Sequence, residues 1–196
     1  MKTNIYIFIG ILAFVYLSCT NPFSTRSPED PDLGGGKPKS QLQTDPDSLL
    51  SKLRSSFGLR DVTDYQECLA DSFQVGKNFI FIPENREINR LSNWNLQDEA
   101  NYFNKLINSD GLEDINISFN TPNAWTFISS DTQQIEFSYQ IEVEFITKTE
   151  FYQGTSIIKI LQSSSSLWYI FYWQDLKINS NDPSDTWSTL KADYRY

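Results

Sequence analysis

Residues 134–145 alternate apolar and polar side chains without a break. The apolar positions are Ile135, Phe137, Tyr139, Ile141, Val143 and Phe145, and the polar positions are Gln134, Glu136, Ser138, Gln140, Glu142 and Glu144. Successive side chains of a β-strand point to opposite faces of the sheet, so this pattern predicts a long antiparallel strand. One face of that strand is expected to cover a hydrophobic core, and the other to meet water.

Further segments predict additional strands. They cover 73–83, which fits a strand or a short hairpin, and 112–121, 124–130, 150–162 and 167–178. The last of these is apolar on both faces, with Trp168, Ile170 and Tyr172 on one side and Tyr169, Phe171 and Trp173 on the other. A strand that is covered on both faces needs two layers. We expect helices to supply one layer, and a partner subunit, the segment around Trp187 or an internal cavity to supply the other.

Three helices are predicted ahead of the long strands. They cover 47–58 and 61–69, and a third begins at Asn95. Apolar residues recur at helical spacing in each segment. Asp47 and Asp61 can cap the first two helices through a side-chain oxygen, and Gly58 suits the C-terminal cap of the first. Helices followed by a meander of antiparallel strands predict an α+β domain with the helices on one face of the sheet.

An unbroken apolar run covers residues 5–17 and follows Lys2. A helix of this length spans roughly 20 Å, which is shorter than the hydrocarbon core of a bilayer at about 30 Å. The run therefore predicts the apolar region of a secretory signal peptide over 1–18.

The run ends at Tyr16-Leu17-Ser18-Cys19, which resembles the lipobox of bacterial lipoproteins. In that motif a small residue before the cysteine allows cleavage once the thiol carries a diacylglyceryl group. Ser18 fits the small position, and Tyr16 departs from the usual Leu. The resemblance implies lipidation at Cys19; the alternative is a plain secretory signal with an incidental Cys19.

Residues 20–46 contain five of the eight prolines and the Gly34-Gly35-Gly36 triplet, with almost no large apolar side chain. Such a segment cannot bury enough surface to order itself, so we predict a flexible tether over 19–46 and one domain over 47–196. Thr20, not Asp, follows the cysteine, which in the enterobacterial sorting rule indicates export to the outer membrane. The chain is therefore expected in the bacterial cell envelope, with the lipid on Cys19 in the outer membrane.

The formal net charge of −9 argues against nucleic-acid binding and against electrostatic attachment to anionic lipids. The chain contains no histidine, which removes Ser-His and Cys-His dyads and the usual zinc sites. Carboxylates at alternate positions of one strand, such as Glu142 and Glu144, diverge too far to hold calcium. No metal and no cofactor are expected. Cys68 has no disulfide partner if Cys19 is acylated, and its apolar helical register predicts a buried small hydrophobe in preference to a reactive thiol.

Several motifs resemble nuclear transport factor 2-like (SnoaL-like) domains. They are 57–65, 68–73, Tyr102-Phe103 and Trp168-Tyr169-Ile170. In that superfamily a helix ends, an Asp-capped helix follows, and a Leu-Ala-Asp-Asp-Phe-type turn enters the first strand. Trp173-Gln174-Asp175 and 187–191 also resemble a group of uncharacterised bacterial lipoproteins with such a domain. The resemblance implies three N-terminal helices packed on a strongly curved antiparallel sheet, a cone around a pocket.

The resemblance also implies candidate pocket residues. Enzymes of the superfamily place an Asp, His or Tyr in the pocket to move protons at carbon acids. In this chain Asp175 is the candidate general base, Tyr102 and Tyr172 are candidate hydrogen-bond donors, and Trp173 is a lining residue. A carboxylate among aromatic rings has a raised pKa, which suits acid–base chemistry. The alternative is that Asp175 caps a strand end or bonds a backbone amide or an indole.

Three functions remain open from the sequence. The preferred hypothesis is a membrane-anchored, non-catalytic module that binds a small apolar ligand or a protein partner. A homodimer or another protein would bind through the sheet face. The second hypothesis is an isomerase-, cyclase- or hydrolase-like enzyme that uses Asp175. The third is a structural envelope lipoprotein.

Overall fold

A computed structural model describes residues 42–121 and 124–195. The predicted signal peptide, Cys19 and most of the predicted tether lie outside the described residues. The helices are α2 (Pro46–Leu59), α3 (Val62–Glu67), α4 (Ser72–Val75), the 3-10 turn η1 (Asn85–Glu87), α5 (Leu96–Ile107) and α6 (Trp187–Asp193). The strands are β1 (Ile80–Ile82), β2 (Leu112–Asn120), β3 (Thr126–Ser129), β4 (Thr132–Phe145), β5 (Lys148–Gln162) and β6 (Trp168–Leu176). Within these described ranges no helix is both long enough and apolar enough to cross a bilayer.

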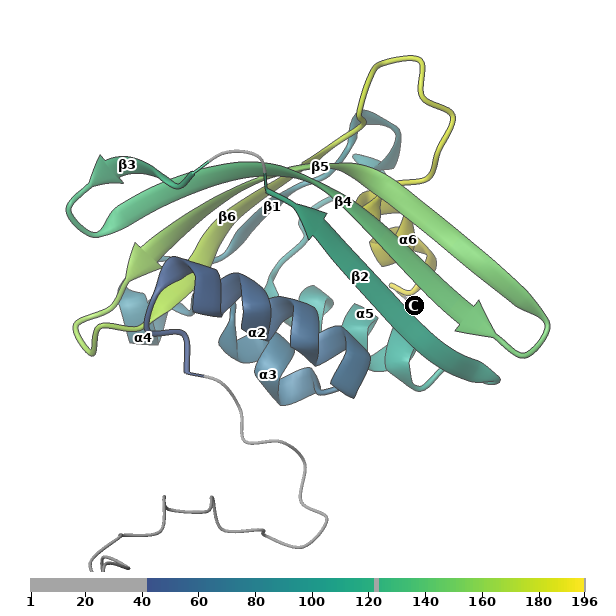
Figure 1. Ribbon diagram of the computed structural model, residues 1–196, viewed down its shortest axis with the longest axis horizontal. Helices are drawn as coiled ribbons and strands as arrows, with labels where there is room; N and C mark the ends of the chain where they lie inside the picture. Colours follow the sequence, from purple (N-terminus) through teal and green to yellow (C-terminus); the bar gives the residue numbers. More distant parts are fainter. Residues whose placement is uncertain (1–41, 122–123, 196) are drawn as a thin grey trace, which may run out of the picture. The chain divides into compact units, whose positions relative to one another are not determined.

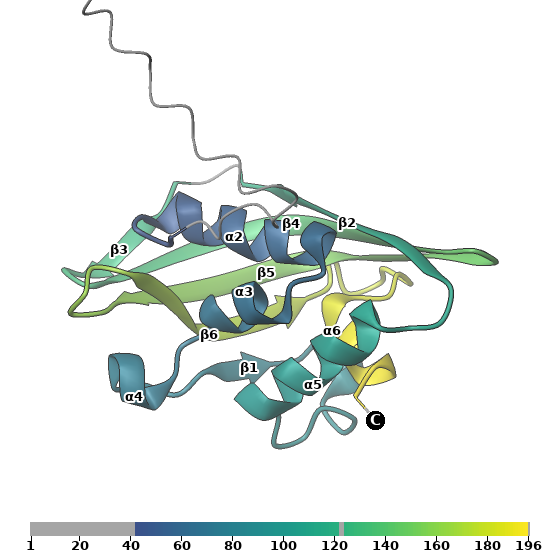
Figure 2. The same cartoon turned by 90° about the horizontal axis from the view of Figure 1, so that it is seen from below.

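The six strands form one sheet in the order β1-β6-β5-β4-β2, and β3 pairs with β4. The sheet arches over the helices, which lie on one of its faces (Figures 1 and 2). We call that face the inner face and the opposite one the outer face. The predicted α+β architecture is confirmed, with one correction: β1 pairs with β6 in parallel, so the sheet is mixed. Helical segments, not a hairpin, follow β1 in the chain, and a parallel neighbour requires such a long connection.

Strand β4 has the predicted register. Its apolar residues from Ile135 to Val143 are buried on the inner face, while Glu136 and Gln140 are exposed. Strand β5 continues the same two faces, because each of its inner residues lies opposite an inner residue of β4. The alternation therefore sets the orientation of the central pair of strands.

Strand β6 departs from simple alternation. Ile160 of β5 pairs with Ile170, and the preceding Lys159 pairs with Tyr172, so Phe171 is an extra residue in a β-bulge. A bulge re-aims the side chains that follow it. Ile170 and Trp173 are consequently both fully buried in the core, and their predicted assignment to opposite faces is wrong. Tyr172 is only half-buried, so the outer face of β6 does not need the full second layer that we expected.

Local capping groups explain where the helices begin. Asp61 accepts hydrogen bonds from the amides of Thr63 and Asp64, as predicted. The third helix begins after Asn95, as expected, and Asn95 forms a capping box with Asp98. The first helix begins earlier than expected, because Asp45 caps it and Pro46 occupies its first position.

The end of the first helix and the segment 73–83 also differ from the prediction. Arg60, with φ of 53°, forms the C-terminal cap of α2, and Gly58 lies inside the helix. Residues of the predicted 73–83 strand divide between α4, which Asp71 caps, and the three residues of β1. A side-chain oxygen directly before the segment favours a helical turn there over an extended strand.

Helix α6 contributes to the core from the far end of the described chain. Trp187 is fully buried, with ring centroids 4.4 Å from Trp173, 5.2 Å from Tyr139 and 5.5 Å from Phe57. It therefore lies between the inner face of the sheet and helix α2. The segment around Trp187 thus covers the inner face of β6, in the same layer as the helices, and does not supply a second layer on the outer face.

Candidate functional site

Three of the four predicted pocket residues lie together inside the domain. Tyr102, Trp173 and Asp175 are fully buried between the sheet and the helices. The fourth, Tyr172, lies on the outer face, where the ammonium of Lys159 is 4.8 Å from its ring centroid. Tyr172 directly precedes Trp173, so strand alternation puts these two side chains on opposite faces. The bulge at Phe171 determines that Trp173 and Asp175, and not Tyr172, face inward.

The Asp175 carboxylate binds the beginning of α6. Its Oδ2 accepts hydrogen bonds from the Ser188 amide at 2.7 Å and the Ser188 hydroxyl at 2.5 Å. Its Oδ1 accepts one from the Tyr139 hydroxyl at 2.6 Å, and that hydroxyl in turn accepts from the Trp187 amide at 2.7 Å. Burial raises the pKa of Asp175, and the hydrogen bonds from Ser188 and Tyr139 oppose that shift. Asp175 therefore orients the first turn of a helix, which matches the backbone-amide alternative stated above.

Gly154 makes the contact between Tyr139 and Asp175 possible. Tyr139 lies opposite Gly154 on the neighbouring strand, and Asp175 lies on the strand beyond. A Cβ atom at position 154 would be 2.5 Å from the Tyr139 hydroxyl and 2.6 Å from the Leu176 carbonyl oxygen. The missing side chain lets the phenol cross β5 and reach the carboxylate on β6.

A second buried carboxylate, Glu99 of α5, binds the other end of α6. Its Oε1 accepts from the Trp94 indole at 2.7 Å and from the Lys191 ammonium, and its Oε2 accepts from the Tyr65 hydroxyl at 2.6 Å. The Glu99 and Lys191 side chains are both fully inaccessible to solvent. The two groups form a buried ion pair at the point where α3, α5 and α6 meet.

Aromatic rings surround the Lys191 ammonium. It lies 3.7 Å from the ring centroid of Phe81 and 4.3 Å from that of Trp173. Burial lowers the pKa of Lys191, and the Glu99 charge opposes that shift. A buried cation with ring faces and one carboxylate around it resembles an occupied ammonium-binding cage. Here a residue of the chain itself occupies the cage.

The remaining predicted pocket residues are also engaged. The Tyr102 hydroxyl accepts a hydrogen bond from the Trp187 indole at 3.1 Å, and the Trp173 indole donates to the Ser156 hydroxyl at 3.1 Å. Burial and the nearby Glu99 charge raise the pKa of Tyr102, which keeps its hydroxyl protonated. The space where the cone pocket was expected therefore contains Trp187 and Lys191.

Sequence reasoning missed Glu99 and Lys191, although a signal for each was present. Glu99 shares the apolar face of α5 with Phe103 and Leu106, and a carboxylate at that spacing indicates a buried, paired charge. Lys191 stands one turn after Trp187, so it follows the buried face of α6.

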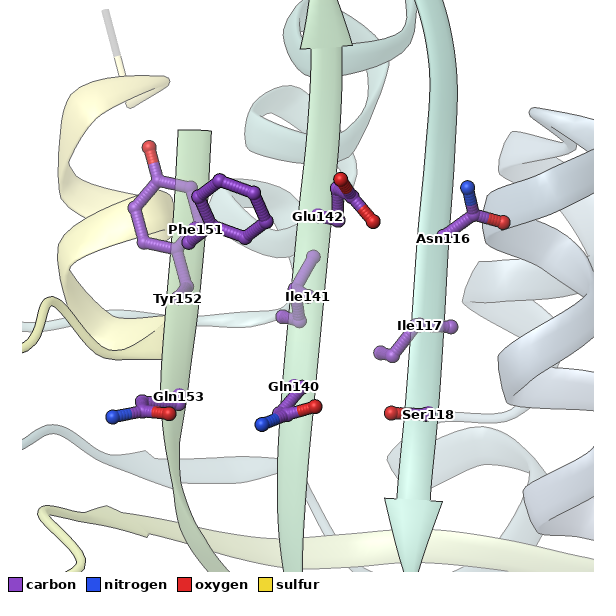
Figure 3. A pocket seen from close by; sticks show the side chains of 9 residues that line it. All are labelled: Asn116, Ile117, Ser118, Gln140, Ile141, Glu142, Phe151, Tyr152 and Gln153. Atoms are coloured by element: carbon purple, nitrogen blue, oxygen red, sulfur yellow. The ribbon is translucent and has the colours of Figure 1, made fainter. Parts of the chain in front are cut away.

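A depression of about 510 Å³ lies on the outer face across β2, β4 and β5. Its outward side chains are Asn116, Ser118, Gln140, Glu142, Phe151 and Gln153 (Figure 3). They form two rows across the three strands, because Gln140 lies opposite Ser118 and Gln153, and Glu142 lies opposite Asn116 and Phe151. Phe151 is 67% exposed. The sequence predicted only a solvated face here, because alternation does not show which polar residues of different strands become neighbours.

Cys68 and two further tryptophans also have structural partners. Cys68 is fully buried, its thiol donates to the Asp64 carbonyl at 3.2 Å, and burial raises its pKa. The Trp125 indole donates to Asp47, and the Trp94 indole to Glu99. Across residues 42–121 and 124–195, no three His, Cys, Asp or Glu side chains are grouped closely enough to hold a metal ion.

Comparison with known proteins identifies the fold. No family model matches the sequence, and no curated protein matches it either. A solved nuclear transport factor 2-like superfamily protein from Salmonella enterica serovar Typhimurium is similar, with a TM-score of 0.51 and 13% identity over 69% of this chain and 89% of that chain. A candidate aromatic ring hydroxylase from Novosphingobium aromaticivorans has a TM-score of 0.53 and 8% identity, over 74% of this chain and 93% of that chain. A nuclear transport factor 2-like protein of unknown function in nutrient uptake from Rhodospirillum rubrum has a TM-score of 0.51 and 10% identity, over 69% of this chain and 99% of that chain.

At these identities the similarity concerns the fold alone. The α+β arrangement of helices on a curved, unclosed sheet is that of nuclear transport factor 2-like proteins, as the resemblance in the sequence implied. The solved structures say nothing about which residues act in this chain.

The close approach at Gly154 gives a first prediction. Gly154→Ala forces a methyl group against Tyr139 and the Leu176 backbone, so it should lower the free energy of unfolding by about 1–3 kcal/mol. Gly58→Ala is the matched control, because nothing lies within 4 Å of a Cβ atom there and α2 should gain up to about 1 kcal/mol. Urea unfolding measures the free energy of unfolding of both variants. Equal midpoints for Gly154→Ala and Gly58→Ala would contradict the close contact at position 154.

The buried ion pair gives a second prediction. Lys191→Met leaves the Glu99 carboxylate buried without its cation, so the free energy of unfolding should fall by about 3–5 kcal/mol. The double variant Lys191→Met/Glu99→Gln should recover part of this loss. The control is Lys148→Met, which breaks an ion pair whose lysine side chain is 60% exposed and should cost less than about 1 kcal/mol. Chemical unfolding measures these free energies. If Lys148→Met and Lys191→Met lower the free energy of unfolding by similar amounts, the site around Glu99 is not desolvated.

Proposed function

We propose that this chain is a bacterial lipoprotein, anchored in the outer membrane through acylated Cys19, whose nuclear transport factor 2-like domain binds a protein partner without catalysis. The partner binds the outer face of the sheet at the depression over β2, β4 and β5. The observation that carries this proposal is the filled interior, where Trp187 and Lys191 occupy the place of a ligand. The outer face is then the surface left for recognition.

The geometry of Asp175 favours binding over catalysis. A general base must reach a substrate proton directly or through one water molecule. The Asp175 carboxylate is fully buried, and three donors from Tyr139 and Ser188 already surround it. A substrate would have to displace α6 before it could contact Asp175, so the hypothesis of an enzyme that uses this residue has no support from the geometry.

The chemistry of the depression favours a protein over a small apolar ligand. Small apolar ligands bind in enclosed, mostly apolar cavities. The depression is open, and amide, hydroxyl and carboxylate groups surround the single exposed ring of Phe151. An exposed aromatic ring with polar groups around it is typical of the centre and rim of a protein interface.

Charge distinguishes a different protein from a second copy of this chain. Glu136, Glu142 and Glu144 lie along the outer face of β4, and the formal net charge of the chain is −9. A second copy would bring like charges together across the interface, which costs free energy. We therefore propose a partner of another sequence that presents an apolar side chain next to basic or amide donors. A homodimer through the same face and a purely structural envelope role are the alternative outcomes of the test.

The anchor gives a third prediction. In the producing bacterium, the full chain should incorporate an alkyne-tagged fatty acid and partition into the detergent phase. Cys19→Ser should lose both properties, because the thiol that receives the lipid is absent. Cys68→Ala should keep both, because Cys68 is fully buried in the folded domain. Equal labelling of wild type and Cys19→Ser, or no labelling of the wild type, would contradict the anchor.

The outer face gives a fourth prediction. A photo-crosslinking amino acid at Gln140, in the depression, should yield one discrete protein adduct in the native envelope. The same group at Arg54, exposed on α2, should yield none. Phe151→Asp should reduce the adduct at 140 about tenfold or more, because it places a charge where the apolar contact forms. Ile88→Asp, an equally drastic change on another surface, should leave the yield unchanged.

The adduct mass separates the alternatives. A mass of twice the chain identifies a homodimer and overturns the proposal of a different partner. Equal adducts at 140 and 54, or none at either position, favour the structural role.

A further inference from the structure

Four exposed apolar side chains lie at one end of the domain. They are Leu42, Phe73, Phe127 and Ile128, with exposed fractions of 65%, 98%, 74% and 54%. They come from three separate parts of the chain: the first described residue, α4 and β3. We call this group the apolar end.

Hydrogen bonds to β5 and β6 link two of these parts, the beginning of the described chain and β3. The amide of Trp168 donates to the carbonyl of Gln43, next to Leu42, and Trp168 pairs with Gln162 across β5 and β6. The amide of Gln162 donates to the carbonyl of Asp131, in the turn that joins β3 to β4. The beginning of the described chain and strand β3 therefore lie at the same end of the sheet.

Helix α4 lies at this end as well. Lys77, which follows α4, has its ammonium 4.4 Å from the ring centroid of Phe171 in β6. Hydrogen bonds from Ser129 and Thr132 lower the pKa of Asp131 in the β3–β4 turn, and the nearby charge of Lys77 adds to that shift. Both views show β3, α4 and the β5–β6 turn at one end, and the β4–β5 turn at the opposite end (Figures 1 and 2).

We propose that the apolar end rests on the lipid bilayer, with Phe73, Phe127, Ile128 and Leu42 inserted at the level of the headgroups. This inference rests on the proposed lipid anchor at Cys19. Aromatic and branched apolar side chains are favoured in that interfacial zone, where they leave water without entering the hydrocarbon centre.

The position of Leu42 favours a membrane over other occupants. Leu42 is where the chain from Cys19 joins the described domain, so the apolar end is the end to which the anchor connects. Thr20 to Gln41 reach at most roughly 75 Å when fully extended. A tether of that reach keeps the domain close to the bilayer, and contacts too weak to hold a free protein then become populated.

The charge of the chain determines the kind of contact. A formal net charge of −9 repels anionic headgroups, so the contact is apolar. It should therefore persist at high salt, which screens charges and leaves apolar contacts in place. The end-on orientation also leaves the outer-face depression open to a partner.

The experiment uses the lipidated full chain with a polarity-sensitive dye on one introduced cysteine. Phe73→Cys and Phe127→Cys place the dye at the apolar end, and Ile146→Cys places it in the β4–β5 turn, where the native side chain is 71% exposed. Cys68 is fully buried, so we expect the dye not to label it in the folded protein. Near-ultraviolet circular dichroism checks that each variant is folded. The proteins are reconstituted in phosphatidylcholine vesicles with and without nitroxide-labelled lipid.

We expect the dye at 73 and at 127 to shift to shorter wavelength on the vesicles and to lose most of its emission to the nitroxide lipid. The dye at 146 should do neither, and raising salt from about 0.05 to 0.5 M should change nothing. If the protein floats with the vesicles but the dye at positions 73 and 127 shifts and is quenched no more than the dye at 146, the inference is wrong. The proposed lipid anchor is then still supported. If the chain does not float, the anchor and the inference fall together. A short-wavelength emission at 73 and 127 without vesicles would show that the protein itself covers this end.

Discussion

The carboxylate of Glu99 is buried at the point where three helices meet, and the arrangement of the interior depends on how it is satisfied. Removing a carboxylate from water costs several kcal/mol, which only close donors and a cation offset. Tyr65 from α3, Trp94 from the segment before α5, and Lys191 from α6 provide them. Because each group comes from a different segment, one acidic side chain fixes the relative positions of all three.

Asp175 has the corresponding role at the other end of α6. It binds the amide and hydroxyl of Ser188, while Glu99 binds Lys191 one turn further along. Two carboxylates thus hold a helix of seven residues, and Trp187 fills the volume between them. The interior beneath the curved sheet is thus filled by a segment of the same chain.

The parts of the fold that depend on local pattern could be predicted from the sequence. The alternation around Tyr139 gave the orientation of β4, and Asp61 and Asn95 marked the beginnings of helices. The bulge at Phe171 could not be predicted, because it exists only relative to the pairing of β5 with β6. The candidate site shows the same division. Tyr102, Trp173 and Asp175 lie together in the interior, whereas Tyr172 lies on the outer face. Their partners could not be predicted, because they depend on contacts such as that between Glu99 and Lys191, which are 92 residues apart in the sequence.

Helix α6 also has a consequence for the order in which the chain can fold. Trp187 and Lys191 lie at the centre of the interior, yet both follow every strand of the sheet in the sequence. During synthesis the N-terminal part of a chain emerges first. The inner faces of β4 and β6 therefore lack their central covering until residues 187–191 have been made. The domain therefore has no complete core until the residues of α6 have been synthesised, however early its strands emerge.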